Sequence, residues 1–422
     1  MQLPRRPQME ENLREAKMRP RKIEMGKTTL YGKPGIGTSL AQQRLSTAIL
    51  SAGFSLTGAG TVMLGVLLPT LSLGWGLRDD QAGLLLFLQY FGSGLGAIAT
   101  GLNRIRSLAS GYGLMAVSLC GLTLGGPRTA YAAFLLYGVG LGMAMTSTSL
   151  LFSDRWGDDR AAKLEWLNFV WSVGATAGPV CFLPFLHQGK TRALFAAMLA
   201  ASFAALLWVI LKERQEPRVA PAPRSGPRDP SARVAFSLLL LLAMGAVGVE
   251  VALSGWLTTY SHREGMHSLA GAALATSIFW LGEMTSRLAF STRLLARVGR
   301  RAVLQWGIWG VTASAVAVIA APHPGFILVA AWLAGAFIGP LYPLSLSFLL
   351  ELSPWGWFFA VGGLGAALFP WFTGLLSTHF HSLRVGLIVP SATGLALAVV
   401  NVLVFRYLRH EDGPHASCRV LY

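Results

Sequence analysis

The sequence predicts an all-α polytopic membrane protein whose twelve transmembrane helices form two six-helix, pseudo-symmetric bundles. Three observations predict this fold class: apolar segments of about 20 residues recur along the chain, only 13% of the 422 residues are charged, and parts of the first half recur in the second. A helix of that length crosses a hydrocarbon core of about 30 Å and satisfies its own backbone hydrogen bonds in lipid. A soluble domain would carry about a quarter charged residues.

The apolar segments and the polar stretches between them define the expected organisation. The expected spans are 46–70, 81–102, 107–126, 129–152, 163–186, 191–211, 233–258, 268–292, 301–321, 325–350, 355–378 and 384–407. The spans group into bundles at 46–212 and 233–408, flanked and joined by a basic N-terminal arm at 1–45, a linker at 213–232 and a tail at 409–422. The linker is rich in Pro and Arg, a composition typical of flexible connections.

The basic charge of the chain falls on one side of the predicted membrane. Most of the 35 Lys and Arg residues behind the formal net charge of +16 lie in the two tails, the linker and the loops of that side. Loops rich in Lys and Arg stay in the cytoplasm. We therefore expect a multi-pass protein of the inner (cytoplasmic) membrane with both termini cytoplasmic, and no nucleic acid partner.

Two short patterns recur in the two bundles at nearly equal offsets. The Gly-Ala-x-x-x-Pro pattern at 174–179 recurs at 365–370, an offset of 191 residues. Parts of 82–94 recur at 270–282, an offset of 188 residues. Recurrence at equivalent spans indicates a duplicated six-helix unit, and parallel repeats of this kind surround a central site in known transporters.

Two stretches near predicted loops resemble a known family. They are Leu67-Leu68-Pro69-Thr70-Leu71 with Asp80-Gln81-Ala82-Gly83, and Leu294–Arg301. The first resembles the passage between the first two helices of the major facilitator superfamily, and the second resembles its basic loop between the second and third helices of a half. The resemblance implies the major facilitator fold and a transport function. Ala296 stands where the family usually has an Asp, and 101–106 also lacks that Asp.

Three further stretches resemble the fucose-permease-like sugar–proton symporter branch of the family. They are Leu167–Ala175, Gly339-Pro340-Leu341-Tyr342-Pro343 and Gly248–Leu257. This resemblance implies proton-coupled sugar transport. That branch places functional carboxylates in the first and fourth spans, where this sequence has hydroxyl groups but no acid. Coupling would therefore fall to another acid or be absent.

Two acidic residues lie well inside predicted spans. An acid at membrane depth costs about 3 kcal/mol on insertion scales, so it normally faces a cavity or a partner. Glu250 has no basic residue within its helix, and we expect it to bind the coupling proton; a structural hydrogen bond to another helix is the alternative. Glu283 precedes Arg287 by four residues, the favourable order for an ion pair. We expect these two to form a gating or structural pair.

The candidate substrate-binding residues combine amide or hydroxyl groups with aromatic rings, a mixture typical of ligand pockets. They are Gln89, Asn168, Trp171, Trp256 and Tyr342. The alternative for the aromatic residues is anchoring at the membrane interface. Glycine-rich stretches at 92–96 and 138–142 lie inside apolar helices, where small residues favour close helix packing rather than nucleotide binding.

These features predict a secondary active transporter of a small polar solute, a sugar or related metabolite, that is proton-coupled and works by alternating access. The alternative is efflux of amphipathic drugs or metabolites by proton antiport, and a membrane receptor or scaffold is a third class. No catalytic signature or P-loop occurs, so we expect no enzyme activity, no catalytic residues, no metal site and no cofactor besides the proton. The expected partners are the solute and the lipid bilayer, and we expect a monomer.

Overall fold

The computed structural model of the chain describes residues 40–101, 103–155, 160–186, 190–212, 230–266, 268–290, 297–352 and 358–409. Residues 1–39 of the predicted arm, 213–229 of the predicted linker and 410–422 of the predicted tail lie outside these ranges, as do residues 294–296 of the basic loop motif. Residues Ala48–Tyr422 form one compact unit. All contacts described below lie within that unit.

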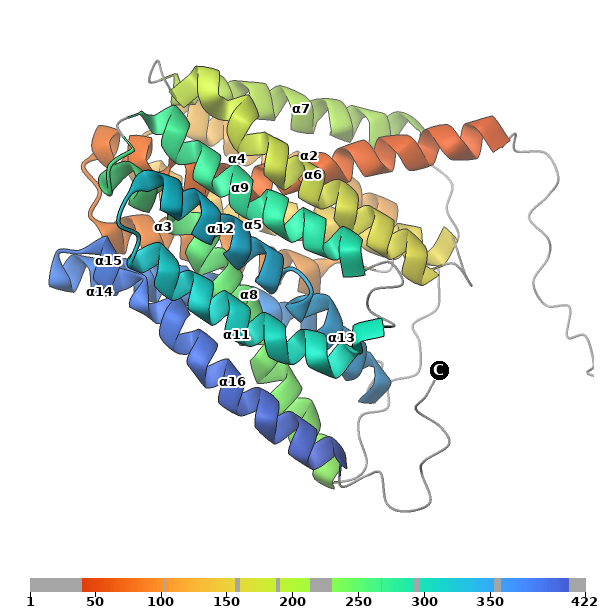
Figure 1. Cartoon of the computed structure of the whole chain (residues 1–422). Helices are drawn as coiled ribbons and strands as arrows, with labels where there is room; N and C mark the ends of the chain where they lie inside the picture. Colours follow the sequence, from red (N-terminus) through yellow and green to blue (C-terminus); the bar gives the residue numbers. More distant parts are fainter. Residues whose placement is uncertain are drawn as a thin grey trace, which may run out of the picture. The chain divides into compact units, whose positions relative to one another are not determined.

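The described elements are all helices (Figure 1). In the predicted first bundle they are α2 (Leu40–Trp75), α3 (Asp79–Ala99), α4 (Arg104–Leu124), α5 (Pro127–Arg155), α6 (Arg160–Leu186) and α7 (Thr191–Lys212). In the predicted second bundle they are α8 (Pro230–Arg263), α9 (Leu269–Phe290), α11 (Arg300–Ile319), α12 (Pro324–Ile338), α13 (Leu341–Leu352), α14 (Phe358–Phe380), α15 (Leu383–Gly386) and α16 (Ile388–Arg409).

These helices confirm the predicted fold class. Eleven spans within the described ranges are long and apolar enough to cross a membrane, with α12 and α13 together forming one span and α15 and α16 another. Helix α9 has 22 residues and coincides with the remaining predicted span. It falls outside the eleven because Glu283 and Arg287 lower its mean hydropathy. Charged residues at membrane depth are rare and usually functional.

Two predicted spans are broken rather than continuous. The span predicted at 325–350 divides between Ile338 and Leu341 into α12 and α13. Pro340 lies within the break, and a proline ring cannot continue the hydrogen-bond ladder of a helix. The span predicted at 384–407 similarly divides between Gly386 and Ile388. Pro343 has no N–H that could bind the carbonyl group of Gly339 four residues earlier, and Arg287 donates to that carbonyl group instead (below).

Local sequence signals explain where several helices begin. The side chain of Asn103 accepts a hydrogen bond from the backbone N–H of Arg106 and caps α4. His323 caps α12 in the same way, with Pro324 in the first turn, where a missing N–H costs nothing. Helix α3 begins with two acids, Asp79 and Asp80, and negative charge is favourable at a helix N-terminus.

The duplicated Gly-Ala-x-x-x-Pro pattern makes the same contact in both bundles. A Cβ atom on Gly174 of α6 would lie 1.9 Å from the backbone oxygen of Ser55 in α2. A Cβ atom on Gly365 of α14 would lie 2.0 Å from the backbone oxygen of Met244 in α8. In each bundle, therefore, the fifth span approaches the first so closely that only glycine fits.

Helices of the two predicted bundles also pack directly against each other. Helix α3 packs along α14, and α6 packs along α9. The two bundles also approach closely where Gly65 of α2 meets Gly255 of α8, because a Cβ atom on Gly65 would lie 3.0 Å from the Cα atom of Gly255. These contacts bring the polar residues of both bundles into one region.

Candidate functional site

The acid in the middle of α8 is buried without a polar partner among the described residues. Glu250 is 8% exposed, and no side chain or backbone group in the described ranges forms a hydrogen bond or ion pair with its carboxyl group. Its charge lies within electrostatic reach of Arg287 and Glu283 of α9. The charge of Glu250 also interacts electrostatically with the hydroxyl groups of Tyr90 in α3 and Tyr342 in α13. Glu250 therefore lies where elements of both predicted bundles converge.

The predicted pair of charges on α9 forms. Arg287 Nη2 lies 2.5 Å from Glu283 Oε1, and the side chain of Glu283 is fully buried. The acid precedes the base by one helical turn, the order that favours an ion pair. Because Glu283 is removed from water, Arg287 supplies the counter-charge that makes the buried carboxylate tolerable.

Arg287 also connects α9 to other elements. Its Nη1 donates a hydrogen bond to Ser172 Oγ of α6 at 3.1 Å, and its Nε donates to the backbone oxygen of Gly339 at 3.4 Å. The guanidinium carbon lies 6.0 Å from the centre of the Trp171 ring. Arg287 thus bridges the two predicted bundles and binds the carbonyl group of Gly339, which Pro343 leaves without a backbone donor.

Two tryptophans meet beside this charged group. The rings of Trp171 (α6) and Trp280 (α9) are in edge-to-face contact, with centroids 5.3 Å apart. Both indole N–H groups are buried, and neither finds an acceptor among the described residues. An unsatisfied buried donor costs about 1–3 kcal/mol. Asn168, one turn before Trp171, is only partly buried, so its amide is accessible in the same region.

Two other predicted substrate residues are engaged in helix packing. Gln89 of α3 is fully buried and donates its side-chain N–H to the backbone oxygen of Thr61 in α2 at 2.9 Å. Its amide oxygen has no partner in the described part of the chain. Trp256 of α8 is also fully buried, and its Nε1 donates to the backbone oxygen of Pro370 in α14 at 2.9 Å. The N–H of Trp256 is therefore already used within the protein.

The structure thus gathers some of the sequence-predicted residues and not others. Glu250, Glu283, Arg287, Trp171 and Tyr342 are linked by contact or by electrostatic interaction. Gln89 and Trp256 connect neighbouring helices instead. Ser172 was not among the candidates, although it lies next to Trp171 and shares the helical face of Asn168.

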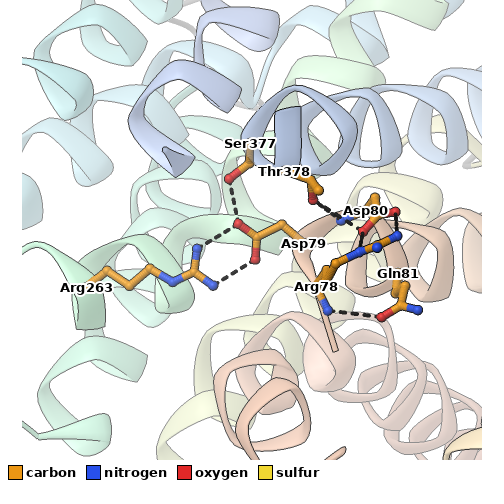
Figure 2. A network of polar contacts seen from close by, with 7 residues as sticks. All are labelled: Arg78, Asp79, Asp80, Gln81, Arg263, Ser377 and Thr378. Carbon is orange, nitrogen blue, oxygen red and sulfur yellow. Dashed lines mark hydrogen bonds and ion pairs between the residues drawn. The ribbon is translucent and has the colours of Figure 1, made fainter. Parts of the chain in front are cut away.

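A second polar network, not expected from the sequence, lies where α3 begins and where α8 and α14 end (Figure 2). Arg263 donates two hydrogen bonds to the Asp79 carboxylate, each 2.7 Å long. Ser377 Oγ donates to Asp79 Oδ2 at 2.5 Å, and the backbone N–H of Asp80 donates to Thr378 Oγ1 at 2.8 Å. We call Asp79, Asp80, Arg263, Ser377 and Thr378 the clasp.

The clasp joins the predicted bundles at one end. Asp79 and Asp80 belong to the first bundle, and the other three residues belong to the second. A bidentate pair between arginine and a carboxylate is among the stronger and more directional polar contacts in proteins. A Cβ atom on Gly374 would lie 2.3 Å from the backbone oxygen of Asp79, so backbone packing and charge hold α3 and α14 together at the same place.

Replacing Asp79 by Asn is expected to loosen this end of the protein. The substitution removes the negative charge that Arg263 binds. Because Arg263 is 42% exposed and water screens the pair, we expect a loss of only about 1 kcal/mol in the interaction between the helices. Amide hydrogen exchange in the last turns of α8 and α14 should become about fivefold faster. Arg78→Gln is the control, since Arg78 is 67% exposed and its pair with Asp80 lies within the first bundle and does not connect the two bundles. Unchanged exchange in Asp79→Asn would mean that the clasp does not hold the helices together.

Comparison with known proteins places this geometry in context. The sequence pattern of the Major Facilitator Superfamily matches residues 50–289. A search of curated protein sequences found no match.

Several solved structures share the fold. A bacterial homologue of the human lysosomal transporter Spinster, in an inward-facing and occupied conformation, superposes with a TM-score of 0.68 at 16% identity, covering 89% of this chain and 99% of that chain. A mutant peptide transporter in complex with sulfate superposes with a TM-score of 0.71 at 14% identity, covering 87% of this chain and 94% of that chain. A mutant fucose:proton symporter of E. coli superposes with a TM-score of 0.57 at 17% identity, covering 85% of this chain and 98% of that chain. At these identities the likeness establishes the fold alone.

Proposed function

The chain belongs to the Major Facilitator Superfamily, and from this premise we propose that it is a proton-coupled secondary transporter of a small polar solute. The solute would be a sugar or a related metabolite. Transport would proceed by alternating access, in which the two bundles move around a central site. The protein would lie in the inner membrane as a monomer, with both termini in the cytoplasm.

The observation that carries proton coupling is the isolated burial of Glu250. A buried carboxylate without a partner is costly when charged and is tolerated when protonated. Arg287 does not offset this cost fully, because it is already paired with Glu283. Glu250 would therefore release its proton only when the site opens to water. That requirement links the protonation state of Glu250 to the conformation of the two bundles.

Arg287 would transmit this change across the bundle interface. When Glu250 loses its proton, it competes with Glu283 for the same guanidinium group. Any movement of Arg287 toward Glu250 weakens its hydrogen bond to Ser172 of α6, which is 3.1 Å long in this structure. The interface between α6 and α9 would thus respond to the charge on α8.

The solute would bind beside this cluster. Asn168 and Tyr342 would supply polar groups, Trp171 an aromatic face and an indole N–H that lacks an acceptor among the described residues. Gln89 and Trp256 would reach the solute only in a conformation in which α3 and α8 separate from their neighbours, because both side chains are fully buried between helices here. Sugars suit such a mixture because they present hydroxyl groups at their edges and apolar C–H faces above and below.

The test is transport by the full chain in proteoliposomes. Candidate solutes are first selected by the rise in thermal unfolding temperature that they produce, since a ligand that binds only the folded state stabilises it. We expect sugars or related polar metabolites to stabilise the protein, and an imposed inward proton gradient to drive their accumulation. Accumulation that does not depend on the proton gradient would contradict the proposal.

A second candidate function is efflux of amphipathic organic cations by proton antiport. It is favoured by the edge-to-face pair of Trp171 and Trp280, which shares Arg287 as a neighbour with the buried acid Glu250, because aromatic faces and carboxylates both attract organic cations. The same thermal screen separates the two candidates. Stabilisation by lipophilic cations but not by sugars would favour efflux, whereas stabilisation by sugars alone would exclude it as the main role.

A further inference from the structure

The outer part of the second bundle has a groove that the residues of the proposed transport site do not line. It lies among α9, α11 and α12 and has a volume of about 410 Å³. This volume is within the range of ligand sites in proteins. Its walls come from the last turns of α9 and the first turns of α11, so the groove lies at the end of the bundle where α9 ends.

The groove is hollow because small residues meet at the junction of three helices. Helix α12 packs against both α9 and α11, whereas α9 and α11 are not among the closely packed pairs of described helices. Ser286 and Ala289 of α9, Gly307 of α11 and Ala336 of α12 line the space that results. A larger side chain at Ala289 or Ala336 would narrow it.

The rim of the groove is aromatic and open. Trp306 is 69% exposed and Trp332 is 40% exposed, and both line the groove together with Phe337. These residues belong to helices that span the membrane, so the groove faces acyl chains rather than water. Exposed tryptophan is typical of the zone where acyl chains meet lipid headgroups.

A basic residue stands beside the mouth of the groove. Val298 lines the groove, and its neighbour Arg297 is exposed. No residue in the described ranges forms a hydrogen bond or ion pair with Arg297. The next two basic residues are already engaged, since Arg300 lies over the Phe348 ring and Arg301 over the Phe405 ring. Among the described basic residues of this segment, Arg297 is thus the one whose charge is available to an anion.

We propose that this groove binds an anionic phospholipid, with one acyl chain between α9, α11 and α12 and the phosphate at Arg297. The apolar walls exclude a polar ligand, and the small residues give the depth that a chain of methylene groups fills. One arginine near the headgroup contributes about 1 kcal/mol toward an anionic lipid. The lipid would wedge α9, the helix that carries Glu283 and Arg287, against α11 and α12.

The test is lipid binding to the full chain, purified in detergent and followed by native mass spectrometry. Phosphatidylglycerol and phosphatidylcholine with the same acyl chains are the probes. We expect the first bound phosphatidylglycerol to bind about fivefold more tightly than phosphatidylcholine, the ratio that one arginine supplies. Arg297→Gln should bring that ratio close to one. Ala336→Trp, which fills the groove, should weaken binding of both lipids.

Matched variants control for unspecific effects. Val329 lies on the same helix as Ala336 and is 57% exposed without lining the groove, so Val329→Trp should bind lipid like the wild type. Arg406→Gln removes an exposed charge elsewhere and should also bind like the wild type. The proposal is wrong if Arg297→Gln and Ala336→Trp bind lipid as these controls do. It is also wrong if the mass spectra show a dimer of the wild type that these two variants lose while their lipid binding is unchanged. Should Ala336→Trp fail to fold, the exposed Arg297→Gln alone decides.

Discussion

Glu250→Gln is expected to lower proton-driven accumulation of the transported solute by about tenfold or more, within the range of coupling free energies between two sites. Glutamine keeps the size of the side chain and resembles its protonated, neutral form, so the protein loses the charge change that links proton release to the opening of the site. Exchange of solute across the membrane without a gradient should persist. Uptake into proteoliposomes at several pH values, with and without an imposed gradient, measures both activities.

The matched control is Glu264→Gln. Glu264 follows the end of the same helix, and it forms an ion pair with Arg384 in which both side chains are partly exposed. It is outside the proposed site, so its loss should leave accumulation within about twofold of wild type, as for a surface pair. Normal gradient-driven accumulation by Glu250→Gln, with an unchanged pH dependence, would show that Glu250 is not the coupling site.

Arg287→Met is expected to destabilise the protein by about 3–5 kcal/mol, the usual cost of leaving one partner of a buried ion pair alone. Glu283 would then be a fully buried carboxylate without its counter-charge. Because protonation neutralises that carboxylate, the destabilisation should shrink as the pH falls. Thermal unfolding of the purified protein at pH 5 and pH 8 measures both effects.

A double variant and a surface variant separate charge from packing. Glu283→Gln combined with Arg287→Met removes both charges and should recover most of the stability lost in Arg287→Met. Arg384→Met breaks a pair in which the arginine is 48% exposed and should cost less than about 1 kcal/mol. If Arg287→Met is as mild as Arg384→Met at pH 8, then the pair with Glu283 does not stabilise the buried site.

The largest and the smallest effects among these variants follow from where each charge lies. Glu283 is buried at membrane depth, whereas Glu264 and Arg78 lie at the ends of helices and remain in contact with solvent. A charge pair in water gains little because water solvates the separated charges well. A pair removed from water is costly to break because the remaining charge has no replacement partner.

Much of the fold was readable from the sequence because lipid imposes a local rule. A segment in lipid must satisfy its own backbone hydrogen bonds, so an apolar run of sufficient length is a helix whatever its neighbours are. Each predicted span corresponds to a described helix or to two short helices in series. Glu283 and Arg287 were predictable as a pair for the same reason, since helical spacing within one element brings them together.

The tertiary structure decided which residues of different helices meet. Arg263 binds Asp79 across 184 positions of sequence, Ser377 binds Asp79 across 298, and Trp256 binds the carbonyl group of Pro370 across 114. Local spacing cannot predict such contacts, because the rotation and depth of each helix depend on the helices packed against it. The sequence alone therefore determined that this chain folds into a bundle of membrane helices with an acid inside. Packing between the helices determined that Glu250 has no hydrogen-bond or ion-pair partner among the residues the structure describes, while Arg287 reaches across to the other bundle.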